Sequence, residues 1–479
     1  MKHLRAGFTI VELAIIIVVI GILATITVVA YNGVKVQAIE SSMKSDLQNA
    51  AAQLEKDRSK NGGYPDSSTT ANNGSGLIAS ENNTLKYRLR ENGYCVSVTS
   101  TKMNGKSFFK ENADGAIQEG VCLPGPANVV TLAGSLTPGY ANGEGTAARF
   151  NILNEVDINY GYGIDIASDG NVYIADTGNN VIRKMTPSGT VSTIAGMPGD
   201  GGEIQSNNGL TSSFNYPFDL SVIASEGEEG LVVPTGSCLR YVGLTNSNHP
   251  TYFINEGALA NHDGHKECAY STQSTTVSEW AALYRDPSSV AVDSNNNVYI
   301  NESDSDKVRK MFWNTSDDWW DSVSVLTAAD EFESETRFGI DPQNRVYGTT
   351  EDHQIVRFTP DGTLSDVAGS STPGFADGTG GAARFNNPLG MDVDGDGNVY
   401  VADCSNHRIR KITPEGVVST IAGSATEGHI DAIGGAARFY CPVDVAINQD
   451  GTLMYVLETR ESNILANQPA GLYVRKLTM

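Results

Sequence analysis

The fold is decided by a segment that the chain contains twice with few changes, DGNVYIADTGNNVIRKMTPSGTVSTIAG (169–196) and DGNVYVADCSNHRIRKITPEGVVSTIAG (396–423). Runs rich in Val, Ile and Tyr alternate with Gly, Asn, Asp and Pro, which favours short β-strands separated by tight turns. Each copy contains an Asp-Gly turn, a second strand, a third strand, a Pro-x-Gly turn and an outer strand. Such self-similarity indicates an array of equivalent all-β units.

A second motif precedes the units and recurs three times, as TPGYANGEGTAARF (137–150), TPGFADGTGGAARF (372–385) and TEGHIDAIGGAARF (426–439). Its arginines, Arg149, Arg384 and Arg438, recur with the repeat, so we expect them to brace contacts between units. Together the two motifs resemble the NHL repeats of β-propellers. The resemblance implies four-stranded blades arranged around a central axis.

Tyrosines in the second strands count the blades. Five copies are marked by Tyr173, Tyr299, Tyr347, Tyr400 and Tyr455, and a worn sixth copy lies at 214–242. The last copy ends at its third strand, YVRKLTM (473–479), whereas NVVTLAG (128–134) stands alone before the first copy. We therefore predict an all-β, six-bladed propeller over residues 128–479, closed by strand 128–134, which leaves no open edge in the ring.

Charge divides the chain into two unlike parts. The formal net charge is -23, and residues 1–126 carry 13 basic and 11 acidic side chains whereas the remainder carries 20 and 45. Sequence-independent binding to nucleic acid needs clustered Lys and Arg, so we expect no nucleic-acid partner.

The first part begins with GFTIVELAIIIVVIGILATITVVAYNG (7–33). Its apolar run, residues 8–31, is too long for a secretory signal but long enough to span a bilayer core. Lys2 and Arg5 precede it, so the start is expected to remain cytoplasmic and the rest to be exported. Glu12 lies inside this run, where a carboxylate is costly and needs a partner.

Gly7 followed by Phe8, with Glu12 at the fifth position after that junction, is similar to the class III signal of type IV pilins. The resemblance implies that a prepilin peptidase cuts after Gly7, that Phe8 is N-methylated, and that Glu12 meets the Phe8 amine of a neighbouring subunit in a filament. It implies a cleaved leader (1–7), a transmembrane and assembly helix (8–62), a small α+β pilin-like domain (63–122) and a linker (123–127).

Apolar residues support a helix that continues beyond the membrane segment. Ile39, Met43, Leu47, Ala50 and Leu54 follow one another at helical spacing, and Asn61-Gly62-Gly63 is a plausible end.

Six cysteines suggest three disulfides in an exported protein. Cys95 with Cys122 follows from the pilin resemblance. On the propeller, antiparallel order places Cys404 beside Cys441 and Cys238 beside Cys268, each pair between adjacent blades.

Four features are candidate sites. The innermost strands offer Asp165, Asp219, Asp293, Asp392 and Asp444 at equivalent positions, although Asp293 is shifted in register, and this favours a repeat consensus over an asymmetric metal site. DVDGDG (392–397) has the spacing of a calcium loop but favours an ordinary turn, and HDGHKEC (262–268) favours a solvated loop over a zinc site. Trp319 and Trp320 lie in a predicted insertion and are weak candidates for a protein or glycan contact.

The sequence thus predicts a non-enzymatic type IV pilus subunit, minor or located at the tip, that presents an extracellular propeller for adhesion or macromolecular binding. Its partners would be the membrane, prepilin peptidase, other pilin subunits and an unknown protein or glycan, with no cofactor. Before assembly it would be a single-pass membrane protein. The alternatives are a pseudopilin of a type II secretion system and a membrane-tethered propeller hydrolase or lyase.

Overall fold

The computed structural model divides into two compact units, residues 1–125 and 126–478. It describes most of residues 10–479. The longer stretches outside the description are 1–9, 66–70, 120–126, 152–161, 255–286, 327–335 and 461–471, and the side chains of residues 10–34 are also outside it.

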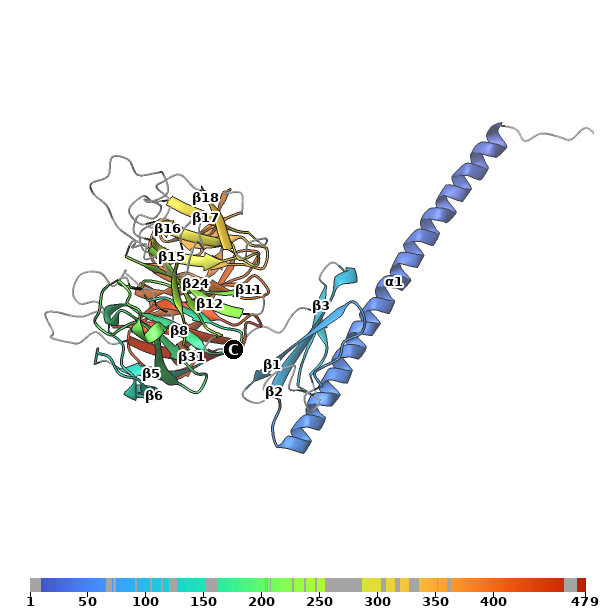
Figure 1. Ribbon diagram of the computed structural model, residues 1–479. Coiled ribbons are helices and arrows are strands. Elements are labelled where there is room, and N and C mark those ends of the chain that lie inside the picture. Colours follow the sequence, from blue (N-terminus) through green and yellow to red (C-terminus); the bar gives the residue numbers. More distant parts are fainter. Residues whose placement is uncertain are drawn as a thin grey trace, which may run out of the picture. The chain divides into compact units, whose positions relative to one another are not determined.

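The first unit is a long helix that is packed against one sheet (Figure 1). Helix α1 runs over Ile10–Asn61, and the strands are β1 (Asn83–Arg90), β2 (Gly93–Ser100), β3 (Ser107–Glu111) and β4 (Gln118–Glu119), in that spatial order and antiparallel. Figure 1 shows these strands alongside only the second half of the helix.

The predicted stripe of helix residues forms the core of this unit. Met43, Leu47 and Leu54 are fully buried, and they belong to one apolar cluster with Tyr94 and Val96 of the sheet. The helix ends where the sequence predicts, because Gly62 takes a positive φ of 79° and its amide donates to the Arg58 carbonyl.

The described residues of the second unit form six antiparallel sheets. Their strands, sheet by sheet from the innermost strand, are β7 (Ile164–Ile166), β8 (Val172–Asp176), β9 (Val181–Met185), β10 (Thr190–Ala195) and β6 (Gly143–Glu144); β11 (Ser221–Ser225), β12 (Glu228–Thr235), β13 (Cys238–Gly243) and β14 (Thr251–Ile254); β15 (Pro287–Val292), β16 (Val298–Glu302), β17 (Lys307–Asn314) and β18 (Trp319–Val325); β19 (Gly339–Ile340), β20 (Val346–Thr349), β21 (Gln354–Phe358) and β22 (Leu364–Gly369); β24 (Pro388–Val393), β25 (Val399–Asp403), β26 (Arg408–Ile412), β27 (Val417–Gly423) and β23 (Gly378–Thr379); and β29 (Cys441–Ile447), β30 (Leu453–Thr459), β31 (Leu472–Thr478), β5 (Asn128–Ser135) and β28 (Ala432–Ile433).

The innermost strands contact one another in sequence order. β7 contacts β11, β11 contacts β15, β15 contacts β19, β19 contacts β24, β24 contacts β29, and β29 contacts β7. This arrangement is consistent with a β-propeller (Figure 1). The strand predicted at 128–134 is β5, and it pairs with β31 from Ser135 opposite Leu472 to Asn128 opposite Thr478, as the sequence predicts.

Each sheet carries an arginine in its third strand, and four of these side chains, Arg183, Arg240, Arg410 and Arg475, have no exposed surface. In the fifth sheet, Arg410 donates to Asp403 at 2.7 Å and to the backbone carbonyl of Arg384 at 3.1 Å. Its guanidinium lies 5.0 Å from the centre of the Phe385 ring. The arginine thus ties the second strand to the AARF motif.

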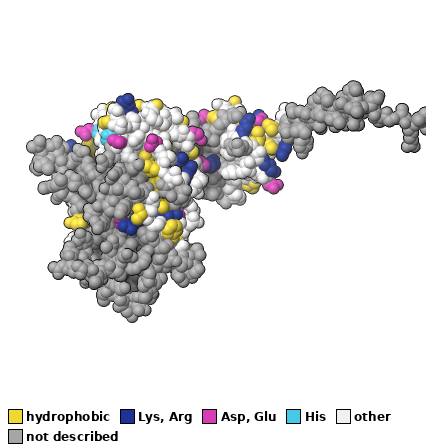
Figure 2. Space-filling view, turned by 90° about the horizontal axis from the view of Figure 1, so that it is seen from above, with side chains coloured by type: hydrophobic (Ala, Val, Ile, Leu, Met, Phe, Trp, Pro, Cys, Tyr) yellow, Lys and Arg dark blue, Asp and Glu magenta, His cyan; other side chains and the backbone are white. Residues whose placement is uncertain are grey.

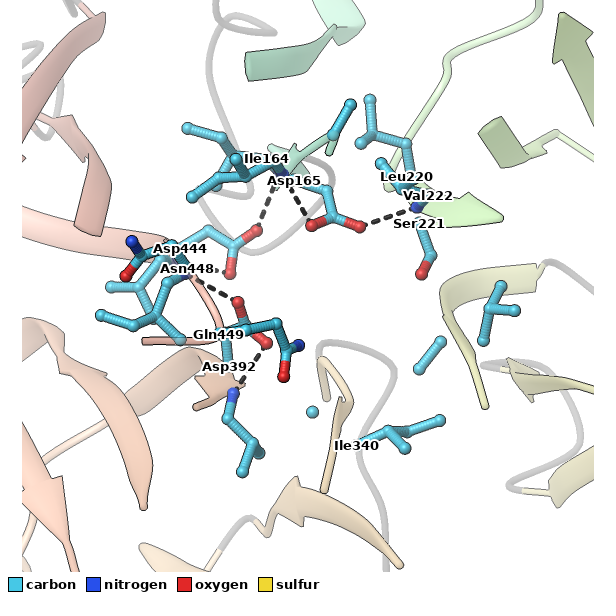
Figure 3. Close-up of a pocket in the computed structure, with 18 of the residues that line it drawn as sticks. Ile164, Asp165, Leu220, Ser221, Val222, Ile340, Asp392, Asp444, Asn448 and Gln449 are labelled. Atoms are coloured by element: carbon cyan, nitrogen blue, oxygen red, sulfur yellow. Dashed lines mark hydrogen bonds between the residues drawn. The ribbon is translucent and has the colours of Figure 1, made fainter. Parts of the chain in front are cut away.

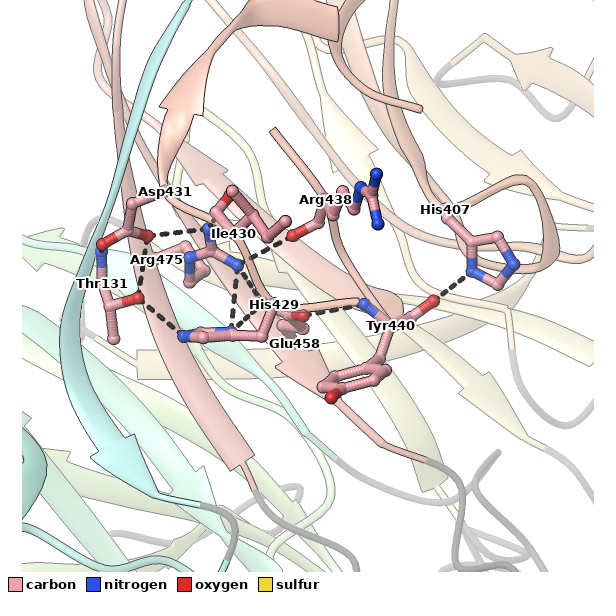
Figure 4. A network of polar contacts seen from close by, with 9 residues as sticks. All are labelled: Thr131, His407, His429, Ile430, Asp431, Arg438, Tyr440, Glu458 and Arg475. Atoms are coloured by element: carbon pink, nitrogen blue, oxygen red, sulfur yellow. Dashed lines mark hydrogen bonds and ion pairs between the residues drawn. The ribbon is translucent and has the colours of Figure 1, made fainter. Parts of the chain in front are cut away.

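Arg183 and Arg475 repeat this arrangement in the first and last sheets. Arg183 contacts Asp176 at 2.6 Å and the Arg149 carbonyl at 3.0 Å, and Arg475 binds Glu458 and the Arg438 carbonyl. Figure 4 shows Arg475 at the centre of a network that also joins Asp431, His429 and Thr131, so that the network reaches β5.

The expectation that the AARF arginines brace the units is therefore corrected. The side chains of Arg149 and Arg384 are exposed, and that of Arg438 is half-buried. What the motif contributes is a backbone carbonyl and the buried phenylalanine ring, and the third-strand arginines supply the charge.

The disulfide between Cys404 and Cys441 is present and joins the fifth sheet to the sixth, as the topology predicts. Cys95 is also disulfide-bonded, but Cys122, its predicted partner, lies outside the described residues. Cys268 and the side chain of Cys238 lie outside them as well, so the second propeller pair stays a prediction.

Replacing Arg410 tests the bracing role. Arg410→Ala leaves Asp403 buried without its partner, so we expect the free energy of unfolding to fall by about 3–5 kcal/mol. Arg384→Ala removes an exposed side chain from the neighbouring motif and is expected to change it by less than about 0.5 kcal/mol. Denaturant unfolding of both variants measures the difference. Equal losses would show that the AARF arginine is the bracing residue after all.

Candidate functional site

Two equivalent positions recur in or just before each innermost strand of the propeller. The first position is the residue of the innermost strand that lies opposite the marker tyrosine of the second strand. We call this position the tyrosine level. It is occupied, from the first sheet to the sixth, by Asp165, Ser221, Ala291, Gly339, Asp392 and Ala446, where the second sheet has Val232 in place of the tyrosine. The second lies two residues earlier, the start level, and is occupied by Gly163, Asp219, Ser289, Arg337, Gly390 and Asp444.

At the tyrosine level, the carboxylates connect one sheet to the next. Asp165 accepts the amide of Val222 in the second sheet at 2.7 Å, and it also accepts the amide that follows it in its own strand. Asp392 does the same in the fifth sheet, where its second oxygen accepts the Ile447 amide of the sixth sheet at 2.7 Å. An innermost strand has a free edge toward the axis, and these carboxylates satisfy amides on that edge.

The start level repeats this connection one sheet further on. Asp219 accepts the Val290 amide at 3.1 Å and the Ser289 hydroxyl at 2.7 Å. Asp444 accepts the Ile164 amide at 3.1 Å, which joins the sixth sheet to the first. We call these four aspartates the carboxylate clamps.

Two glycines make room for the start-level clamps. A Cβ atom on Gly390 would lie 2.0 Å from an oxygen of Asp444 and 2.6 Å from its Cα, and a Cβ on Gly163 would meet Asp219 just as closely. Only glycine allows the neighbouring aspartate to approach.

The pKa values of three clamp aspartates are raised, because these side chains are buried with little positive charge nearby. Arg337 is 7% exposed and lies 3.3 Å from Asp219. Burial raises the pKa of Asp165 to about 6, against the effect of the two amides that it accepts. Burial and the nearby charge of Asp165 raise the pKa of Asp392 to about 8. Burial also raises the pKa of Asp444 well above its usual range, although Arg337 counteracts this.

The clamps border a cavity of about 710 Å³ on the axis, lined by all six innermost strands. Figure 3 shows Asp165, Asp392 and Asp444 gathered on one side and Ile340 on the opposite side. Asn448, Gln449 and Asp450, in the turn after β29, line the cavity at the end where this turn lies.

The expectation that the five acids occupy equivalent positions is therefore right only in part, because Asp165 and Asp392 share the tyrosine level whereas Asp219 and Asp444 share the start level. Asp293 is not at the axis but in the turn after β15, where it accepts the amides of Asn295 and Asn297. The recurring residue at its position is a turn aspartate such as Asp394, which holds the Asn398 amide and the Tyr400 hydroxyl. DVDGDG is accordingly a turn, as the sequence favours. Among the described residues, no group of three His, Cys, Asp or Glu is placed to hold a metal.

The remaining candidate residues are placed only in part. Gly7 and Phe8 lie outside the described residues, as does the HDGHKEC segment, and Glu12 is a residue of α1 whose side chain is not described. No helix in the described part of the chain is both long and apolar enough to cross a membrane.

Trp319 and Trp320 are not in an insertion. They begin strand β18, where Trp320 pairs with Trp313 and Trp319 pairs with Asn314 of β17. The prediction failed because a run of Asn, Thr, Ser and Asp before the tryptophans suggested a loop. Their side chains lie outside the description.

Sequence reasoning missed Arg337, the glycines and the third-strand arginines. The arginines had a visible signal, because every copy carries one in its third strand, at 183, 240, 309, 357, 410 and 475. Arg337 had none, since no other copy has a basic residue at that position.

Comparison with known proteins agrees with the repeat architecture. The NHL repeat matches residues 385–412. Protein SUPPRESSOR OF QUENCHING 1, chloroplastic, of Arabidopsis thaliana is 24% identical over 340 residues, which are 70% of this chain and 27% of that protein. NHL repeat-containing protein 2 of Bos taurus is 34% identical over 131 residues, 26% of this chain and 17% of that protein. The chain thus spans less than a third of these curated relatives.

Solved structures show a similar fold. A protein of unknown function from Bacteroides thetaiotaomicron superimposes with a TM-score of 0.55 at 17% identity, covering 84% of this chain and 92% of that one. A putative phosphatase from the same organism gives 0.51 at 16% identity, covering 80% and 84%. At this identity the likeness concerns the fold alone.

Gly390→Ala tests the start-level clamp. The added methyl group has no space beside Asp444, so we expect a loss of about 2–3 kcal/mol in the free energy of unfolding. Gly381→Ala is the matched control, because the nearest atom to its Cβ is 3.8 Å away. Urea unfolding midpoints measure both. If the two variants were equally stable, the close approach of Gly390 to Asp444 would not hold in solution.

Proposed function

We propose that the chain is a type IV pilin-like surface protein in which the N-terminal helix serves membrane anchoring and filament assembly and a closed six-bladed propeller serves as a binding head. Prepilin peptidase would cut after Gly7 and Phe8 would be methylated. The protein would then move from the membrane to the cell surface, where other pilin subunits are its partners. A head this large favours a minor or tip subunit.

The observation that carries the proposal is the continuity of α1. One helix of 52 residues bears the apolar sequence with Glu12 in its first half and packs on the four-stranded sheet with its second half. A helix that continues so far beyond its sheet needs another environment for its apolar end, and a bilayer or a bundle of identical helices would provide it.

Polar contacts between the helix and the rest of the first unit support the proposal that this unit rigidly joins the N-terminal helix to the remainder of the chain. Asp46 of the helix, which is 5% exposed, accepts the amide and hydroxyl of Ser80 and the amide group of Asn83. Lys106 of the sheet side pairs with Glu40 of the helix at 2.7 Å. The disulfide between Cys404 and Cys441 further supports an exported location, since such bonds persist in oxidising compartments.

A binding function is favoured over catalysis by the clamps. Asp165 and Asp392 already accept a backbone amide on each oxygen, and one of these amides belongs to the neighbouring sheet, so these side chains have a structural role that accounts for their presence. Figure 2 shows both acidic and basic side chains among the described residues of the face in view. A pseudopilin of a type II secretion system has the same N-terminal motif, so this motif does not separate the two functions.

Two substitutions test the assembly role in a bacterium that produces type IV pili. Gly7→Ala is expected to leave the leader uncut, which immunoblotting detects as a larger chain. Glu12→Ala is expected to be cut normally but to be lost from sheared filaments, because the Phe8 amine loses its partner. Lys44→Ala, an exposed change on the same helix, is the control. Normal filament content of Glu12→Ala would contradict the assembly role.

Adhesion of cells that display the protein tests the binding role. We expect the cells to bind at least one member of a panel of glycans and matrix proteins. In a Trp319→Ala, Trp320→Ala double variant this binding should fall by more than about tenfold, which is the loss typical of hot-spot residues. Val325→Ala changes an exposed residue of the same strand and serves as the control. Unchanged adhesion in the double variant would assign the contact to another part of the propeller.

A further inference from the structure

We propose that the axial cavity binds an organic cation with an apolar tail, of the alkylammonium or lysine side-chain type, whose charged head lies among Asp165, Asp392 and Asp444 and whose tail lies against Val292 and Ile340. The inference concerns the propeller alone and does not depend on the pilin-like role of the N-terminal unit.

The cavity has the size and the construction of a small-molecule site. Its volume of about 710 Å³ lies within the range of about 300–1,000 Å³ that is typical of such sites. Asp165 and Asp392 each keep some exposed surface as residues, and both line the cavity.

The carboxylates have hydrogen-bonding capacity left for a ligand. A carboxylate offers about four acceptor sites. In Asp165 and in Asp392, each oxygen accepts one backbone amide. An ammonium group, which has three donors and no acceptor, can therefore bind to the remaining lone pairs without displacing a clamp.

The charge of Arg337, which also lines the cavity, acts on Asp444, but Asp165 and Asp392 have no basic partner among the described residues. Arg337 pairs with Asp219, and no ion pair joins Asp165, Asp392 or Asp444 to a basic side chain among the residues that the structure describes. The raised pKa values of Asp165 and Asp392 express the same deficit, because burial makes an uncompensated negative charge costly. A cation in the cavity would relieve it.

Apart from Arg337, the wall formed by the third and fourth sheets is apolar, and its apolar part defines the second half of the ligand. The third and fourth sheets have Ala291 and Gly339 at the tyrosine level, and Val292 and Ile340 follow them with surface on the cavity. Figure 3 shows Ile340 across the cavity from Asp392 and Asp444. A bare metal ion would leave this wall without a contact, and a carboxylate or phosphate ligand would be repelled by the clamps.

Isothermal titration calorimetry of the full-length chain with hexylammonium, hexanol and hexanoate tests the proposal. We expect only hexylammonium to bind. Its affinity should rise by about tenfold between pH 6 and pH 9, because the raised pKa values mean that Asp165 and Asp392 lose their protons in this range while the amine stays charged.

Three variants locate the two ends of the ligand. Asp392→Asn should weaken hexylammonium binding at pH 9 by about tenfold, since it removes a charge-assisted hydrogen bond. Asp396→Asn removes the same charge from an exposed position of the next turn and should leave the affinity unchanged. Ile340→Ser should weaken hexylammonium while leaving methylammonium unaffected. If Asp392→Asn fails to fold, the pH profile and Ile340→Ser still decide.

The proposal is overturned if hexanol binds as tightly as hexylammonium, or if Asp396→Asn has the same effect as Asp392→Asn. It is also overturned if Ca²⁺ alone binds in an Asp392-dependent manner while hexylammonium does not, because the cavity would then be a metal site.

Discussion

The propeller depends on how the free edges of its innermost strands are satisfied. A sheet that ends at the axis presents amides that no further strand can accept, and an unsatisfied buried amide costs about 1–3 kcal/mol. The carboxylate clamps answer this in four of the six sheets, and in the third sheet the Ser289 hydroxyl accepts the Phe338 amide at 3.3 Å. The same bond that satisfies an edge also fixes the position of the next sheet.

A second set of contacts acts farther from the axis in the first, fifth and sixth sheets. The buried third-strand arginine contacts an acid at the end of the second strand, two backbone carbonyls and a phenylalanine ring. Because an unpaired buried guanidinium is costly, each of these partners depends on the others. Two kinds of contact therefore recur along the chain. Near the axis, the carboxylate clamps join one sheet to the next, and farther out, the buried arginines join a sheet to the loop that precedes it.

Much of this architecture was predictable, since strand periodicity, turn residues and marker tyrosines are local signals. The pairing of Cys404 with Cys441 and of β5 with β31 also followed, because antiparallel order constrains which segments meet. The clamps did not follow, because one aspartate per copy does not reveal whether its partner lies in the same sheet or the next. Asp293 illustrates this, since a shift of two residues along the strand moves an acid from the axis into a turn.

The pairing of β5 with β31 also determines when during synthesis this sheet can form. β5 is made first, but its partner β31 is made last, and Thr131 contacts a residue 300 positions further along the chain. At roughly 5–20 residues per second, the wait is on the order of half a minute. During that time the strand emerges without its sheet, so a chain cut short before β31 would leave both ends of the propeller exposed to chaperones and proteases. The propeller sheet that contains β5 can therefore form only after the chain has been synthesised through β31.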